Sequence, residues 1–233
     1  MAIVTPDSLA ATLDAVNEAL FFGRAVGKTE REGVAAWIAA RQGLPGSYAG
    51  MFAPTEKNLR EGARFFTGEH LPSRAGTAHV LGEEACRALI LLDASDAGAR
   101  AALERARQGM LGRLRAAEAR ERNTGRLWLG TYCCGKCSVA LWRHLAAGGL
   151  EDSERHLAAA MKALQLNRDG TGKWRRFPFH YTLLALSEVN LPAAIEEMRY
   201  AAPTLERLLT RRQADGPFER RRRAVAERIL AKC

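Results

Sequence analysis

Apolar residues recur every three or four positions along most of the chain, with charged residues between them. Leu103, Ala106, Met110 and Leu114 form one such stripe in a segment otherwise rich in Arg and Glu. This spacing predicts amphipathic helices that keep one face in water. Stretches rich in Val, Ile and Thr, from which strands are built, are missing, so we expect an all-α fold.

Gly, Pro and Asn/Asp clusters divide the chain into ten predicted helices. They cover residues 6–23, 27–42, 55–67, 77–93, 97–121, 133–147, 151–166, 178–189, 191–213 and 217–231. Segments 181–186 and 88–92 are apolar almost all round, which is typical of helices buried on every side. Buried inner helices that alternate with amphipathic outer helices predict a single domain, residues 1–233, with a first helix (1–26) and α/α hairpins over 27–233.

Two parts of the chain resemble one another at a fixed offset. Segment 101–107 is similar to 193–199, and 111–114 is similar to 205–208. The offset corresponds to two helix pairs, and repeats of this size are typical of helical solenoids and toroids. The alternative is chance similarity between helices rich in Ala, Leu, Glu and Arg.

Three loops share a glutamine at a helix end, a glycine turn and an aromatic residue that begins the next element. The residues are Gln42, Gly46 and Tyr48; Gln165, Gly172 and Trp174; and Gln213, Gly216 and Phe218. This pattern resembles the QW repeat of terpenoid cyclases and the related repeats of protein prenyltransferase β subunits. Of the three aromatic residues, Trp174 alone is the tryptophan of that family, and the other two loops depart from it.

The resemblance implies an α/α toroid, shortened or open because the chain holds about five helix pairs, with closure by a homodimer as one option. It further implies an apolar ligand, isoprenoid or lipid-like, between the inner helices. It does not imply a reaction, because the family's acid motif and zinc ligands find no match here. The segment 93–96 has two carboxylates only, and we expect Asp96 to cap the helix that follows.

The densest chemical feature is the run of three cysteines, Cys133, Cys134 and Cys137, at a predicted helix start. A helix N-terminus and the neighbouring Lys136 both favour a thiolate. Thiolates there suit a metal ligand, a nucleophile or a redox pair. A zinc site needs further ligands. The candidates are His180 and, on an earlier helix, His79 with Glu83, and we expect His180 to join the three cysteines. The alternative is that small apolar thiols pack where inner helices crowd together.

A second cluster lies in 76–87, where His79, Glu83 and Cys86 share one helix face. A buried glutamate is costly unless it is paired, so Glu83 or Glu84 is a candidate acid/base group with a raised pKa. The alternative is a pair of surface glutamates beside Arg87. The predicted catalytic residues are Cys133, Cys137, His79 and Glu83.

The segment 173–180 mixes cations with aromatic residues, which suits a phosphate or diphosphate beside an apolar pocket. The predicted ligand-binding residues are Trp174, Arg175, Arg176, Phe179, His180 and Tyr181. The alternative is an ordinary loop between helices, because Pro and Gly punctuate it.

The positive charge of the chain is concentrated near its C-terminus. Among 233 residues, 35 are Lys or Arg and 26 are Asp or Glu, which gives a net charge of +9. The densest basic run is Arg220, Arg221, Arg222 and Arg223. This run predicts contact with nucleic acid or another acidic surface, or else a solvated helix. A non-catalytic scaffold that binds protein or nucleic acid is therefore the alternative function.

The five cysteines do not form a disulfide pattern, so we expect a cytoplasmic protein.

Overall fold

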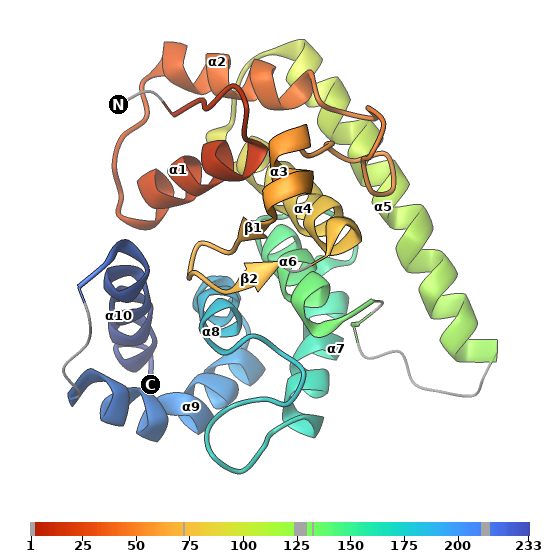
Figure 1. Ribbon diagram of the computed structural model, residues 1–233. Coiled ribbons are helices and arrows are strands. Elements are labelled where there is room, and N and C mark those ends of the chain that lie inside the picture. Colours follow the sequence, from red (N-terminus) through yellow and green to blue (C-terminus); the bar gives the residue numbers. More distant parts are fainter. Residues whose placement is uncertain (1–2, 72, 124–129, 132, 211–214) are drawn as a thin grey trace.

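The computed structural model describes residues 3–71, 73–123, 130–131, 133–210 and 215–233 (Figure 1). This part of the chain is almost entirely helical, which confirms the all-α prediction. Its helices are α1 (Leu9–Phe21), α2 (Lys28–Ala39), α3 (Glu56–Glu61), α4 (Arg74–Leu92), α5 (Ala97–Asn123), α6 (Gly135–Ala146), α7 (Ser153–Leu166), α8 (Phe179–Glu188), α9 (Pro192–Thr210) and α10 (Pro217–Leu230). Each predicted helix has its counterpart, with ends that differ mostly by a few residues.

A short hairpin was not predicted. Strand β1 (Ala63–Arg64) pairs antiparallel with β2 (His70–Leu71). The helix predicted over 55–67 instead ends at Glu61, because Gly62 adopts a φ of +78°, a conformation that few other residues tolerate. The turn then closes with a hydrogen bond from Phe65 N to Glu69 O of 2.9 Å.

Side-chain caps explain where several helices begin. Ser8 accepts a hydrogen bond from the amide of Ala11, and Thr55 and Asn58 form a reciprocal capping box. Asp96 caps α5 through a 2.6 Å hydrogen bond from Ala99 N, which confirms its predicted role.

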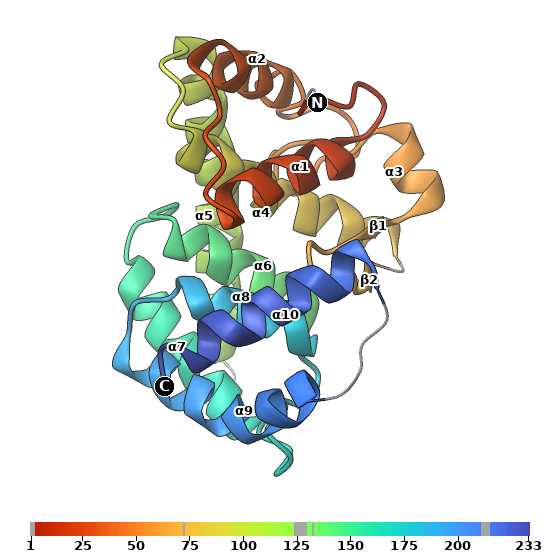
Figure 2. The same ribbon diagram turned by 90° about the vertical axis from the view of Figure 1, so that its left-hand side faces the viewer.

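The helices lie in two sets. Helices α4, α6, α8 and α10 pack against one another in chain order, and α1 packs on α4. Helices α5, α7 and α9 each pack on the helix that precedes them, and α2 lies against α5 (Figures 1 and 2). The predicted stripe of α5 is buried, as expected for an amphipathic helix. The toroid and its repeats stay a prediction.

The two helix segments expected to be buried on every side, 181–186 and 88–92, differ in how completely they are buried. In α8, residues 181–187 are all buried. In α4, Leu91 is 38% exposed, so that segment is not enclosed as predicted. Instead α4 buries polar side chains nearer its middle, including His79, Glu83 and Glu84.

Two of the three glutamine–aromatic loops are closed by a short backbone bridge. Isolated antiparallel bridges join Gln42 to Phe52 and Arg168 to Trp174. The first bridge therefore pairs Gln42 with Phe52 rather than with Tyr48, and the repeat itself stays a prediction. Gln165 lies on the surface, where its Oε1 accepts a hydrogen bond from Lys162. Gln213, in the third loop, lies outside the described residues.

Candidate metal centre

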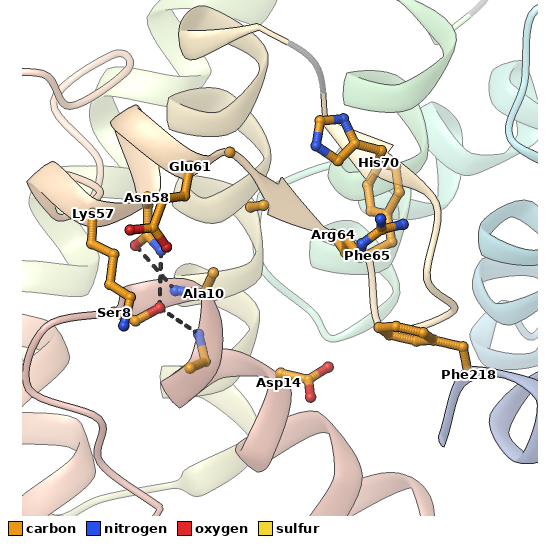
Figure 3. Close-up of a pocket in the computed structure, with 13 residues that line it drawn as sticks. Ser8, Ala10, Asp14, Lys57, Asn58, Glu61, Arg64, Phe65, His70 and Phe218 are labelled. Atoms are coloured by element: carbon orange, nitrogen blue, oxygen red, sulfur yellow. Dashed lines mark hydrogen bonds between the residues drawn. The ribbon is translucent and has the colours of Figure 1, made fainter. Parts of the chain in front are cut away.

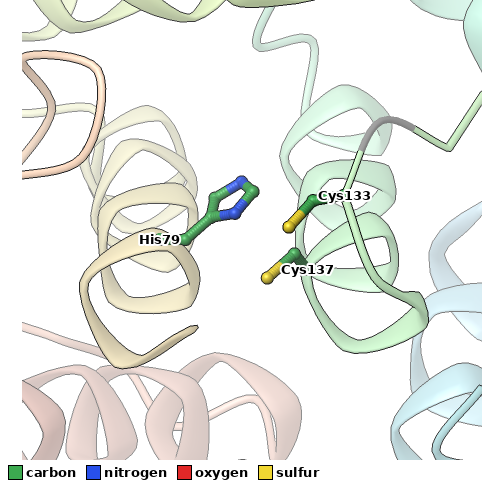
Figure 4. Close-up of side chains that lie close together, drawn as sticks. All are labelled: His79, Cys133 and Cys137. Atoms are coloured by element: carbon green, nitrogen blue, oxygen red, sulfur yellow. The ribbon is translucent and has the colours of Figure 1, made fainter. Parts of the chain in front are cut away.

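The packing of α4 against α6 brings the four predicted catalytic residues together. His79 and Glu83 lie one turn apart on α4, whereas Cys133 and Cys137 flank the start of α6. The ligand atoms of His79, Cys133 and Cys137 all lie within 4.8 Å of one another (Figure 4). Cys137 is buried and Cys133 is exposed, so the group reaches the surface on the Cys133 side.

Two neighbours orient the His79 imidazole. Its Nε2 lies 3.5 Å from Oε1 of Glu83. The ring of Tyr48 stacks on it, with 4.1 Å between the ring centroids. With Nε2 directed at the carboxylate, Nδ1 is the ring atom left for the two thiols across the gap between the helices.

Glu83 is fully buried and is held by a second histidine. Its Oε2 lies 2.7 Å from Nδ1 of His144, whose side chain is likewise fully buried. Burial opposes ionisation, yet contacts with His144 and His79 outweigh it, and the pKa of Glu83 falls below its usual value. The predicted raised pKa is therefore wrong, and so is the alternative of surface glutamates, since Glu84 is buried too.

The thiols differ in how readily they ionise. The hydrogen bond with His79 lowers the pKa of Cys133, despite partial burial. The hydrogen bond with Cys137, aided by backbone amides of residues 136 and 137, lowers the pKa of Cys134 to about 5. The same thiol–thiol contact, together with burial, raises the pKa of Cys137. Burial opposes the charged form of the His79 imidazole, but Cys133 and Glu83 outweigh it and raise the pKa of His79.

His180, a predicted metal ligand, is not in this group. It lies in the first turn of α8, near Glu69, Arg222 and Lys173, and burial lowers its pKa to about 4. The hairpin explains this position, because Glu69 Oε1 accepts a hydrogen bond of 2.9 Å from the amide of Tyr181. Of the two candidate partners of the cysteines, the structure therefore brings His79 to Cys133 and Cys137 and leaves His180 outside the group. Cys134 also stands outside the group of three.

The predicted ligand-binding residues do not converge on one pocket. Trp174 is buried and donates a 2.7 Å hydrogen bond to Glu197 Oε2. Tyr181 is buried and donates to Glu84. Arg175 and Arg176 are exposed, and the Lys173 ammonium lies 5.2 Å above the Phe179 ring. Trp174 and Tyr181 are therefore core residues.

A buried ionic network beside the centre was not predicted. Arg143 pairs with Glu84 on α4 and with Glu188 on α8, at 2.5 and 2.9 Å. Arg87 also pairs with Glu188, and Asn17 of α1 bonds both Arg87 and Glu84. The only sequence signal was an arginine within the apolar stretch of α6. The network ties α1, α4, α6 and α8 together and so fixes the two helices that carry the centre.

A cavity of about 400 Å³ lies between α1, α3, the hairpin and the start of α10 (Figure 3). Charged and polar side chains line much of it, among them Asp14, Lys57, Glu61 and Arg64. Its position and polarity differ from the apolar pocket expected between the inner helices.

The four consecutive arginines of α10 are engaged within the chain. Their partners are Glu18 for Arg220, Asp14 and Glu18 for Arg221, Thr67 O for Arg222, and Glu227 for Arg223. The run therefore joins α10 to α1 and to the hairpin turn, which reduces its value as a phosphate-binding surface.

Across the described residues, no helix has the length and apolar character needed to cross a membrane. Comparison of the chain with protein-family models, with curated proteins and with solved structures gave no match.

Proposed function

We propose that the protein binds a zinc ion through His79, Cys133 and Cys137. The observation that carries the proposal is the mutual approach of these three ligand atoms to within 4.8 Å. Zinc prefers sulfur at about 2.3 Å and nitrogen at about 2.0–2.1 Å in a tetrahedron, which separates ligand atoms by about 3.5–3.8 Å. A contraction of about 1 Å, within the reach of side-chain rotation, would complete the site.

The surroundings of His79 fit a metal ligand. A zinc-bound imidazole usually donates its other N–H to a carboxylate, which fixes the ring and raises its basicity. Glu83 stands at that position, opposite Nε2, and His144 holds Glu83 from its other oxygen. Glu83 Oε1 is buried without a hydrogen-bond partner among the described residues, and an Nε2–H on a metal-bound His79 would satisfy it.

Three protein ligands leave a fourth position for water or substrate, which is typical of catalytic rather than structural zinc. The exposure of Cys133 puts this position on the open side of the group. A zinc ion there would lower the pKa of bound water to about 7 or hold a substrate thiol as thiolate. The reaction class we propose is therefore zinc-assisted hydrolysis or thiol activation.

The other functions stay predictions with less support. An isoprenoid or lipid-like ligand calls for an apolar pocket. The 400 Å³ cavity instead mixes charged side chains with apolar ones such as Phe65 and Phe218, and it shares no residue with the metal centre. A nucleic-acid scaffold calls for free cations, and Arg220–Arg223 already have intramolecular partners.

Metal analysis tests the proposal. Reduced protein is loaded with zinc, dialysed and assayed by plasma mass spectrometry, with circular dichroism to verify folding. We expect one zinc per chain in the unaltered protein and in the control Cys233→Ser, which removes an exposed thiol far from the site. His79→Ala, Cys133→Ser and Cys137→Ser should each reduce zinc occupancy strongly. Full occupancy in a folded His79→Ala protein would overturn the assignment.

A further inference from the structure

Cys134 stands outside the three-ligand group, yet its Sγ lies 3.5 Å from Sγ of Cys137. We propose that Cys134 and Cys137 form a reversible disulfide by exchange with an external disulfide, and that this bond withdraws Cys137 from the metal centre. The exchange activity stands on the geometry of the two thiols alone. Its coupling to the metal rests on the proposed zinc function.

The start of α6 places the two sulfurs together. Cys134 is the N-cap residue, with extended backbone angles, and Cys137 lies in the first helical turn. A disulfide has an S–S distance of about 2.05 Å, so rotation of the side chains by roughly 1.5 Å suffices to form it. The unpaired amides of the first turn stabilise negative charge on the N-cap sulfur.

The surrounding backbone holds this turn in place. The side chain of Lys136 extends to the hairpin, where its Nζ donates a 2.8 Å hydrogen bond to His70 O. On the other side, a Cβ on Gly135 would lie only 2.0 Å from Arg176 O, so the loop after Trp174 presses directly on the turn. The segment between the two cysteines is therefore clamped from both sides, and this preorganises the sulfurs.

The two thiols differ in access, which sets the order of events. Cys134 is exposed, whereas Cys137 is 2% exposed. An external disulfide reaches Cys134 first, and Cys137 lies behind it as the resolving thiol. This is the arrangement required of an exchange pair.

The proposed exchange has two steps. The Cys134 thiolate attacks one sulfur of an external disulfide, so that a mixed disulfide forms and one thiolate leaves. The Cys137 sulfur then attacks Cys134, which breaks the mixed bond and releases the second thiolate. Two protein thiols are oxidised, one external disulfide is reduced, and the two thiol protons end on the released thiols.

The oxidised state cannot complete the proposed centre. Once Cys137 is bonded to Cys134, His79 and Cys133 are the two ligands that remain, and protein zinc sites use at least three. Zinc release should therefore accompany disulfide formation, with one ion freed per bond.

The test equilibrates the zinc-loaded full chain with reduced and oxidised glutathione at a series of ratios. Samples are acid-quenched, alkylated and analysed by mass spectrometry and peptide mapping, while a chromogenic chelator reports free zinc. Cys134→Ser is the informative variant, since it removes the exchange pair and keeps all three metal ligands. His79→Ala is its complement, since it removes a metal ligand and keeps the pair.

We expect the five free thiols to fall to three, a bond mapped to Cys134 and Cys137, and stoichiometric zinc release. Cys134→Ser should keep its four free thiols and its zinc in the same buffer. His79→Ala should still form the bond. Five free thiols in excess oxidised glutathione, or a bond mapped to Cys133, would overturn the exchange proposal. A bond formed without release of bound zinc would overturn the coupling, and a bond formed in a protein that never binds zinc would refute the metal centre alone.

Discussion

Nδ1 of His144 lies 2.7 Å from Oε2 of Glu83, and neither side chain exposes any surface. The other oxygen of Glu83 faces His79, so one buried carboxylate connects two histidines on adjacent helices. If His79 binds zinc, Glu83 orients a ligand without touching the metal.

Glu83→Gln should therefore weaken zinc binding about 10- to 100-fold, the usual cost of losing a carboxylate behind a metal-bound histidine. The measurement is a zinc competition titration with a chelator of known affinity. Glu118→Gln is the control, because Glu118 is likewise a carboxylate beside a histidine, His156, but is only partly buried and lies outside the centre. Equal zinc affinity in Glu83→Gln and the unaltered protein would separate Glu83 from the metal.

Arg221 should contribute much of the stability with which α10 docks. Its side chain is 7% exposed and pairs with Asp14 and Glu18 of α1 at 2.8 and 2.6 Å. Arg221→Met leaves Asp14 without its arginine and Glu18 with Arg220 alone. Because both carboxylates are partly exposed, we expect the free energy of unfolding to fall by about 2–3 kcal/mol, less than for a fully buried pair. Urea denaturation measures this change.

Arg223→Met is the control for Arg221. Arg223 pairs with Glu227 one turn away, and both side chains are 55% exposed. Exposed pairs of this kind contribute about 0.3–0.5 kcal/mol. A similar loss of unfolding free energy in Arg221→Met and Arg223→Met would mean that the four arginines act by their charge alone and not by docking α10 on α1.

Two glycines of one loop separate backbone conformation from close packing. Gly170 and Gly172 share a φ of +86°, but a Cβ at Gly172 would lie 2.6 Å from Thr204 Oγ1, and a Cβ at Gly170 would meet nothing within 4 Å. Gly170→Ala should cost about 1 kcal/mol from the positive φ, and Gly172→Ala should cost about 1–3 kcal/mol more. Thermal unfolding of both variants checks this, and equal losses would show that Thr204 moves aside freely.

His180 should make stability depend on pH. Its pKa in the folded chain is about 4, below the ordinary value of 6.5, because burial disfavours its charged form beside Lys173 and Arg222, against the opposing charge of Glu69. The stabilising effect is complete above pH 6.5 and is lost as the pH falls towards 4. Between pH 7 and 5 the loss amounts to about 2 kcal/mol.

The readout is the free energy of unfolding measured at several pH values for the unaltered protein and for His180→Gln. The other titrating groups are common to both proteins, so the difference between the two curves isolates His180. Parallel curves from pH 7 to 5 would contradict a lowered pKa.

The helices could be predicted from sequence because each follows from local signals. The apolar stripe of α5 and the Asp96 cap can each be recognised within a single short stretch of sequence. The hairpin was missed because two-residue strands leave no alternating pattern, and because Gly62 interrupts what otherwise reads as helix. Without the hairpin, the contact that Glu69 makes with the amide of Tyr181 at the start of α8, beside His180, could not be predicted either.

Only part of the candidate site could be predicted from the sequence, for a similar reason. The cysteine run and the His79–Glu83 spacing are local, so both were predicted, with His79 and Glu83 as one of two candidate partners of the cysteines. Their meeting depends on the packing of α4 against α6, and His144 could not be recognised before that packing was known. The sign of the Glu83 pKa shift was predicted wrongly because it depends on this second histidine.

The most direct test of the metal centre is X-ray absorption spectroscopy at the zinc edge of the reduced, zinc-loaded protein. The first coordination shell should contain two sulfurs at about 2.3 Å and an imidazole nitrogen at about 2.0–2.1 Å, with one further light atom. The imidazole signature should disappear in His79→Ala. A shell of three sulfurs would bring Cys134 into the centre, and a shell of nitrogen and oxygen alone would contradict zinc binding by Cys133 and Cys137.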